Sequence, residues 1–169
     1  MCSQIRIAGI IKESIVDGPG IRMVIFAQGC HHNCPGCHNP ETHSFEAGTL
    51  TDIDEIIAQA KKNPLLDGLT FSGGEPFEQA GAFAVLANKA RSLGLNIMTY
   101  TGYTYEYIDS VSKTNEEWDR LLQETDILVD GEFQLEKRNL LLKFRGSENQ
   151  RIIDAKKSQL EKKVILHNV

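Results

Sequence analysis

The sequence has few cysteines, no long apolar run and no excess of positive charge. Its 169 residues include 4 cysteines, and 18 Lys and Arg against 23 Asp and Glu give a formal net charge of -5. The apolar runs fall far short of the roughly 20 residues of a membrane-spanning helix, and the N-terminal residues lack the pattern of a secretory signal. A negative chain has no broad electrostatic attraction for nucleic acid or anionic membranes. We therefore expect a cytoplasmic protein with neither nucleic acid nor membrane as a partner.

Short apolar runs alternate with helical patterns along the middle of the chain. Four runs rich in β-branched and aromatic residues predict buried strands: IRMVIFA, GLTFS, LNIMTYT and DILVD. Three segments between them predict helices: TDIDEIIAQAKK, EPFEQAGAFAVLANKARSLG and NEEWDRLLQE. Thr51 is the expected N-cap of the first helix, Gly94 the expected C-terminal cap of the second, and Phe83, Leu86, Ala87 and Ala90 form one apolar stripe. Consecutive βα units of this kind give a parallel sheet.

The length limits how many of these units the chain can hold. Eight βα units need about 250 residues, whereas this chain has 169. No repeat, low-complexity tract or linker divides it. We therefore predict one α/β domain over residues 1–169, a partial (βα) barrel open on one side. Its ligands should bind at the C-terminal ends of the strands.

Three of the four cysteines lie within one short segment, GCHHNCPGCHNPE. Cys30, Cys34 and Cys37 directly follow the first predicted strand, and three thiols cannot all pair with one another. In a reducing compartment clustered thiols indicate metal or redox chemistry. The spacing C-x-x-x-C-x-x-C suits one 4Fe-4S cluster and leaves one iron without a thiolate, free to bind a substrate. Cys2 lies far from this loop in the sequence, and we expect it to take no part.

Two other interpretations of the loop stay open at this point. A structural zinc ion could use the three cysteines with His31, His32 or His38, because Cys₃His is an ordinary tetrahedral zinc set. The chain would then be a zinc-stabilised interaction module rather than an enzyme. The CPGC portion could also be a redox dithiol, although that leaves Cys30 without a role.

A second motif, TFSGGEP, ends the second predicted strand. Gly73 and Gly74 permit close approach of a ligand to the backbone, whose carbonyls can accept from an ammonium group. Glu75 adds an anionic acceptor. The segment therefore suits an amino-acid moiety, although Gly-Gly and Glu-Pro are also common in plain strand-to-helix turns.

With both motifs in this order, the sequence resembles the radical S-adenosylmethionine (SAM) superfamily, which carries them on a (βα) barrel. The resemblance implies that Gly73, Gly74 and Glu75 hold the methionine amine of SAM while the three cysteines bind the cluster. Many members place an aromatic residue near the adenine just before the third cysteine. This chain has Gly36 there and His38 directly after Cys37. The resemblance therefore implies cofactor contacts at Gly36, Cys37 and His38.

Further segments are similar to the activases of glycyl radical enzymes. VDGPGIR, residues 16–22, lies just before the first strand, and YTGY, LVDGEF and FRGSENQRIID resemble the activating proteins of the anaerobic (class III) ribonucleoside-triphosphate reductase. The likeness runs from Asp17 to about Asp154. It implies reductive cleavage of SAM, a glycyl radical made on the reductase, and reduced flavodoxin or a similar electron donor. Asp17 and Arg22 are then candidates to line the channel for the partner glycine.

The activase resemblance leaves one alternative and one segment unexplained. The partner could be another glycyl radical enzyme, such as pyruvate formate-lyase. The segment FRGSENQR has no chemical role that its residues alone predict.

Overall fold

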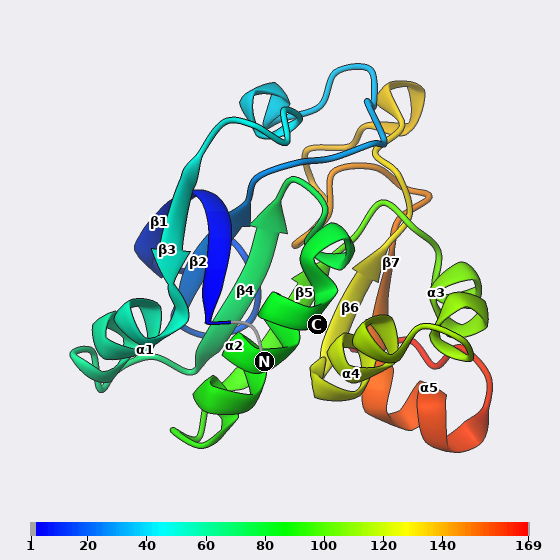
Figure 1. Cartoon of the computed structure of the whole chain (residues 1–169). Coiled ribbons are helices and arrows are strands. Elements are labelled where there is room, and N and C mark those ends of the chain that lie inside the picture. The colour runs from blue at the N-terminus through cyan, green and yellow to red at the C-terminus, as the bar shows by residue number, and fades with distance from the viewer. Residues whose placement is uncertain (1–2, 169) are drawn as a thin grey trace.

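The computed structural model describes residues 3–168, which form one open seven-stranded sheet (Figure 1). The strands are β1 (Gln4–Ser14), β2 (Arg22–Ala27), β3 (Thr49–Asp52), β4 (Gly68–Gly73), β5 (Asn96–Tyr100), β6 (Ile127–Asp130) and β7 (Arg151–Asp154). Their order across the sheet is β3-β1-β2-β4-β5-β6-β7. The sheet confirms the α/β class, and its two edges, β3 and β7, do not meet.

The centre of the sheet is parallel and its margins are antiparallel. β2, β4, β5 and β6 pair in parallel, as the four apolar runs predicted. β1 pairs antiparallel with both β2 and β3, and β7 pairs antiparallel with β6. The C-terminal ends of the parallel strands therefore lie together at one end of the sheet, where the loops that follow β2 and β6 lie above the arrowheads in Figure 1.

Five α-helices and three 3₁₀ turns lie between or after the described strands. They are α1 (Ile53–Lys61), α2 (Ala80–Arg91), α3 (Tyr105–Ser112), α4 (Glu116–Glu124), α5 (Ala155–Glu161), η1 (Pro40–Thr42), η2 (Pro76–Gln79) and η3 (Leu135–Lys137). The three predicted helices are present as α1, α2 and α4. Within residues 3–168 no helix is both long and apolar enough to cross a membrane.

The predicted helix ends need correction. Thr51 is not the N-cap of α1, because it pairs with Ile5 in β3 and Asp52 precedes the helix instead. The C-cap of α2 is Ser92, and Gly94 follows two residues later with a φ of +82°. Competing strand pairing explains the first error, since β3 extends directly into α1.

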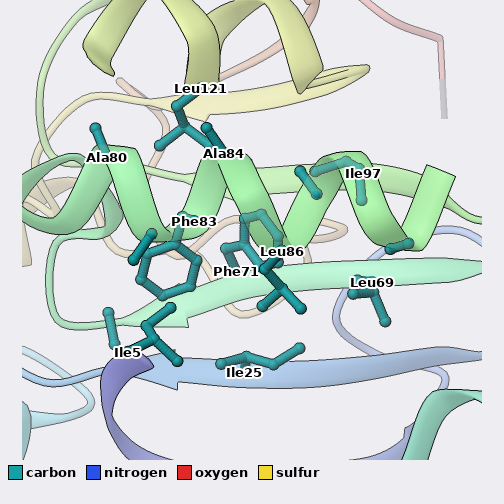
Figure 2. Close-up of a cluster of buried hydrophobic side chains, with 14 of the residues drawn as sticks. Ile5, Ile25, Leu69, Phe71, Ala80, Phe83, Ala84, Leu86, Ile97 and Leu121 are labelled. Atoms are coloured by element: carbon teal, nitrogen blue, oxygen red, sulfur yellow. The ribbon is translucent and has the colours of Figure 1, made fainter. Parts of the chain in front are cut away.

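The main core lies between the sheet and α2 (Figure 2). Phe83 of α2 packs on Phe71 of β4 with ring centroids 4.8 Å apart, and Leu86 of α2 belongs to the same core cluster. The predicted stripe is confirmed, because Phe83, Leu86, Ala87 and Ala90 are all 0% exposed. Ala84 contacts the next layer, where Leu121 of α4 covers the helix in Figure 2.

The other face of the sheet has a smaller apolar cluster. Met98, Val129 and Ile152 alternate along β5, β6 and β7 with residues of the main core, and Tyr100 and Phe144 pack against them. Because side chains alternate along a strand, this face is distinct from the one that α2 covers. It carries a cavity instead of a layer of helices.

Candidate functional site

A cavity of about 500 Å³ opens at the C-terminal ends of the parallel strands. The cysteine loop after β2, the Gly73–Gly74 turn after β4 and the segment after β6 all contribute to its wall. Cys30, Cys34, Cys37 and His38 line it. The structure thus brings the two sequence motifs, which lie about forty residues apart, to one cavity at the edge where parallel α/β sheets bind ligands.

Backbone turns position the cysteine loop. The Cys37 N–H donates to the Cys34 carbonyl (3.1 Å), and the Cys30 N–H donates to the carbonyl of His43 (3.1 Å). Gly29 and Gly36 have φ values of +107° and +73°, a region that glycine occupies without strain. The loop is therefore folded back on itself so that its three cysteines border the same space.

The donor set of this loop fits an iron-sulfur cluster. All three cysteines are free and half-buried. Asn39 N–H and His43 Nε2 each lie 3.4 Å from Cys37 Sγ, as N–H donors to a thiolate would. Burial raises the pKa of Cys30 to about 11, so a cluster must displace a proton from this thiol when it binds.

The histidines of the zinc alternative make other contacts. His31 stacks on Phe45 with centroids 4.4 Å apart, and His38 lies 5.0 Å from the ring of Phe133. His32 binds two carboxylates instead of a thiol. Among residues 3–168, no three His, Cys, Asp or Glu side chains are gathered closely enough to hold one metal ion.

Glu75 lies beneath the cavity and does not line it. Its side chain is fully buried, and its carboxylate accepts from His32 Nε2 (2.6 Å), Gly102 N–H (2.8 Å), Thr101 Oγ1 (2.9 Å) and Phe77 N–H (3.1 Å). Both oxygens are therefore engaged within the chain. The expectation that this carboxylate faces an ammonium group does not agree with its placement.

His32 connects the cysteine loop to two strand ends. Nε2 binds Glu75, and Nδ1 lies 3.1 Å from Glu132, which follows β6. Burial alone would lower the pKa of His32, but its hydrogen bonds and proximity to Glu75 and Glu132 outweigh this effect and raise it. The sequence suggested His32 only as a possible zinc ligand. Its partner lies 43 residues away, so no local signal could reveal the pair.

The Gly73–Gly74 turn is held closely against β2 and the cysteine loop. Gly74 N–H donates to Ala27 O, and Glu75 N–H donates to Gly29 O, both at 2.8 Å. A Cβ on Gly74 would lie 2.4 Å from the Gly29 oxygen, so a side chain does not fit there. Both glycines line the cavity, which keeps their backbone close to any ligand.

Asp17 and Arg22, the two candidate residues of the DGPG segment, lie in different environments. Asp17 lines the cavity and accepts a 2.5 Å hydrogen bond from Ser14 Oγ. Arg22 is 0% exposed and donates to Thr70 Oγ1, Pro19 O and Leu69 O at 2.7, 3.0 and 2.9 Å. The prediction that Arg22 lines a channel for a partner is therefore wrong. Its guanidinium fixes the loop before β2, and burial lowers its pKa to about 10.

The segment FRGSENQR forms part of the cavity wall. Gln150 Oε1 accepts from Gly146 N–H (2.9 Å) and Ser147 N–H (3.1 Å), while its Nε2 donates to Gly131 O (3.0 Å). Phe144, Gly146 and Gln150 line the cavity. The structure thus gives this segment a structural role that the sequence did not predict. Cys2 lies outside the described residues.

Comparisons with known proteins agree with this arrangement. A family model described as a 4Fe-4S single cluster domain matches residues 16–153. The anaerobic ribonucleoside-triphosphate reductase-activating protein of Vibrio cholerae serotype O1 is 38% identical over 144 residues, which cover 80% of this chain and 89% of the relative. Proteins of the same name from Haemophilus influenzae and Enterobacteria phage T4 are each 33% identical over 146 residues, covering 80% and 81% of this chain and 89% and 86% of the relatives. Because the family model and these relatives all cover most of the chain, the chain belongs to the family of anaerobic ribonucleoside-triphosphate reductase-activating proteins.

Proposed function

We propose that this chain is a radical SAM enzyme that generates a glycyl radical on an anaerobic ribonucleoside-triphosphate reductase. The observation that carries the proposal is the single cavity shared by three free thiols and the Gly73–Gly74 turn. In this reading the open sheet is the partial (βα) barrel of the superfamily. A reducing cytoplasm is the matching compartment, because iron-sulfur chemistry of this kind needs free thiols and a strong reductant.

The chain's own residues bind and orient the reactants. Cys30, Cys34 and Cys37 hold a 4Fe-4S cluster through three thiolates. The backbone of Gly73 and Gly74 accepts from the methionine amine of SAM, because the absence of side chains lets a ligand approach. His38 lines the same cavity, Gly36 directly precedes Cys37 in the loop, and both contact the rest of the cofactor. Glu75 acts indirectly, by fixing the turn and His32.

A 4Fe-4S cluster held by the three cysteines would supply one electron for reductive cleavage of SAM. With the hydrogen atom taken from the partner glycine, the products would be methionine, 5′-deoxyadenosine and a glycyl radical, and a one-electron donor such as reduced flavodoxin would supply the electron. Asp17, at the cavity wall, is the candidate contact for the incoming backbone.

Anaerobic reconstitution of cysteine variants tests the cluster assignment. Cys30→Ala, Cys34→Ala and Cys37→Ala should each lose the brown 4Fe-4S chromophore, and Cys2→Ala is the matched control that should keep it. A colourless parent protein that retains zinc would favour the interaction module instead. Retention of the full cluster by Cys34→Ala would contradict the three-thiolate site.

The partner is tested with the reduced, cluster-replete protein. SAM and an anaerobic ribonucleotide reductase should give a glycyl doublet by electron paramagnetic resonance, together with 5′-deoxyadenosine. A doublet with pyruvate formate-lyase alone would move the proposal to that class of partner. If reduced protein with a full cluster bound no SAM, the enzyme proposal would fail.

A further inference from the structure

The segment after β6 forms a small hairpin next to the cavity, which we call the 137–148 hairpin. Arg138 and Ser147 form an antiparallel bridge. Glu148 N–H donates to Lys137 O (2.9 Å), and Asn139 N–H donates to Gly146 O (3.2 Å). These bonds close the hairpin at its base and leave residues 140–145 as its tip.

The tip is ordered by its own hydrogen bonds and by the sheet. Asn139 Oδ1 accepts from Leu141 N–H (2.9 Å), a local turn that begins the tip. At the other side Tyr100 Oη, at the end of β5, donates to Phe144 O (2.5 Å). Phe144 and Leu142 line the cavity, and Phe144 also packs on the smaller apolar cluster.

Two leucines on this ordered tip point into solvent. Leu140 is 85% exposed and Leu141 is 92% exposed, although Leu142 beside them borders the cavity. A single exposed leucine is ordinary. An adjacent pair held out by a hydrogen-bonded turn, beside a site proposed to receive a protein, offers exposed apolar surface that a partner could bury.

Other apolar side chains lie at the same rim. Ile15 and Val16 are 74% and 71% exposed, and Val16 lines the cavity together with Asp17. Apolar residues from two segments that are far apart in the sequence, Val16 and Leu142, therefore line the cavity that the partner glycine is proposed to enter.

The hairpin also differs from the rest of the chain in charge. Residues 137–148 contain two lysines and two arginines against one acidic residue, Glu148 at the base, in a chain of net charge -5. A cationic segment with two exposed leucines matches a protein surface that offers an apolar recess flanked by carboxylates. Association with such a surface should weaken as salt is added, because salt screens exposed charges.

We propose that the tip of the 137–148 hairpin, through Leu140 and Leu141, is a docking surface for the glycine-bearing protein of the reductase. The inference rests on the proposed function, because it places the partner at the mouth of the same cavity. Docking there would hold the reductase beside the rim while its glycine segment enters between the hairpin and Val16. The partner would also exclude water from the open side of the site.

The test is a double variant, Leu140→Ser with Leu141→Ser, in the cluster-replete full chain. Leu160→Ser on α5 is the matched control, since Leu160 is 83% exposed and does not line the cavity. We expect the double variant to keep its cluster and its dithionite-driven cleavage of SAM. Its dissociation constant for purified reductase should rise about tenfold or more, as for truncation of central contact residues. The glycyl radical yield at limiting protein should fall in parallel, and the control should match the parent.

A second variant examines the charge. Lys143→Glu should bind the reductase more slowly than the parent at low salt, and the difference should shrink at high salt. Equal reductase affinity for the parent and the leucine double variant would overturn the docking surface while leaving the proposed function intact. A loss of self-association by light scattering, with reductase binding unchanged, would assign the surface to a second copy of this chain. A defect seen with reduced flavodoxin but not with dithionite would assign it to the electron donor, and would also overturn the proposal.

Discussion

Replacement of Glu75 by glutamine separates two roles that the sequence could not distinguish. If Glu75 binds SAM directly, the variant protein should bind SAM more weakly and keep its stability. If Glu75 is a buried structural carboxylate, the variant protein should be less stable. The side chain of Glu75 is fully buried, with four donors around its two oxygens. We therefore expect the glutamine variant to be destabilised first.

The magnitude follows from the donors that glutamine cannot satisfy. In the parent, the Phe77 N–H donates to Glu75 at 3.1 Å. If the amide oxygen of the glutamine stays beside His32 and Gly102, its NH₂ group faces this N–H, and two donors then oppose each other. A hydrogen bond to a charged group contributes about 1.5–3 kcal/mol, and the bond from His32 also loses its ionic partner. We expect the free energy of unfolding to fall by about 3 kcal/mol, a large part of the roughly 5–15 kcal/mol of an ordinary domain.

Urea unfolding of the cluster-free chain measures this change, and Glu46→Gln is the control because Glu46 is exposed in the same cysteine-loop region. The midpoint of thermal unfolding should drop by about 6–12 °C for a chain of this size. SAM affinity is then measured on the cluster-replete fraction that stays folded. A glutamine variant as stable as the parent, with SAM binding abolished, would refute the structural role of Glu75.

Three further changes have definite expected outcomes. Gly74→Ala places a Cβ 2.4 Å from a backbone oxygen, so unfolding should become easier by more than about 2 kcal/mol; unchanged urea stability would contradict this close contact. His43→Phe removes the N–H donor 3.4 Å from Cys37 Sγ, so the cluster potential in an anaerobic redox titration should become more negative; an unshifted or higher potential would argue against that hydrogen bond. The hydrogen bond from Arg151 lowers the pKa of Glu106, so its stabilisation is present above the unfolded value of 4.5 and is lost as pH falls. Glu106→Gln should cost at most about 1 kcal/mol at pH 7, and the difference between the two proteins should vanish in acid; a difference that persists or grows there would exclude the ion pair as its cause.

The parallel centre of the sheet was predictable because its strands are buried on both faces. Runs such as MVIFA within IRMVIFA and ILV within DILVD are continuously apolar, which is typical of strands inside a parallel sheet. The antiparallel margins were not predicted. β1 has only Ile5, Ile7 and Ser14 buried among its eleven residues. β7 has four residues and depends on pairing with β6, so tertiary context rather than local sequence defines both strands.

The site was predictable where its signal is local. The spacing of the three cysteines and the pair of glycines lie in short segments, and the structure brings them to one cavity. The charged residues were misread for a physical reason. Glu75 was expected to face a ligand as an anionic acceptor, and Arg22 to face the partner by resemblance to the activases, whereas both are buried, which is rare for Arg and Glu. Their burial becomes visible only when donors and acceptors from distant strands surround them.

Buried charges lie at both ends of the parallel strands in this fold, and the two carboxylates lie at the end where the cavity opens. Arg22 lies at the start of β2, Glu75 follows β4, and Asp130 ends β6, each at most 1% exposed. Asp130 accepts from Tyr105 N–H (2.8 Å) and Arg151 Nε (3.0 Å), as Glu75 accepts from its own neighbours. A buried charge costs desolvation energy that only complete hydrogen bonding offsets. Each charged nitrogen or oxygen of these groups has at least one hydrogen-bond partner, and most of these partners belong to loop backbone or strand ends.

The same bonds explain the contrast between the floor of the cavity and its rim. Beneath the cavity, hydrogen bonds to buried carboxylates fix the turns that would bind the cluster and SAM, and such positioning is what one-electron chemistry on a bound cofactor needs. At the rim, Leu140, Leu141 and Val16 are 85%, 92% and 71% exposed. A surface that must admit a partner segment cannot be closed in advance by its own contacts. The division into a fixed floor and an exposed apolar rim is therefore what the proposed function requires, because the radical it would generate is destined for another protein.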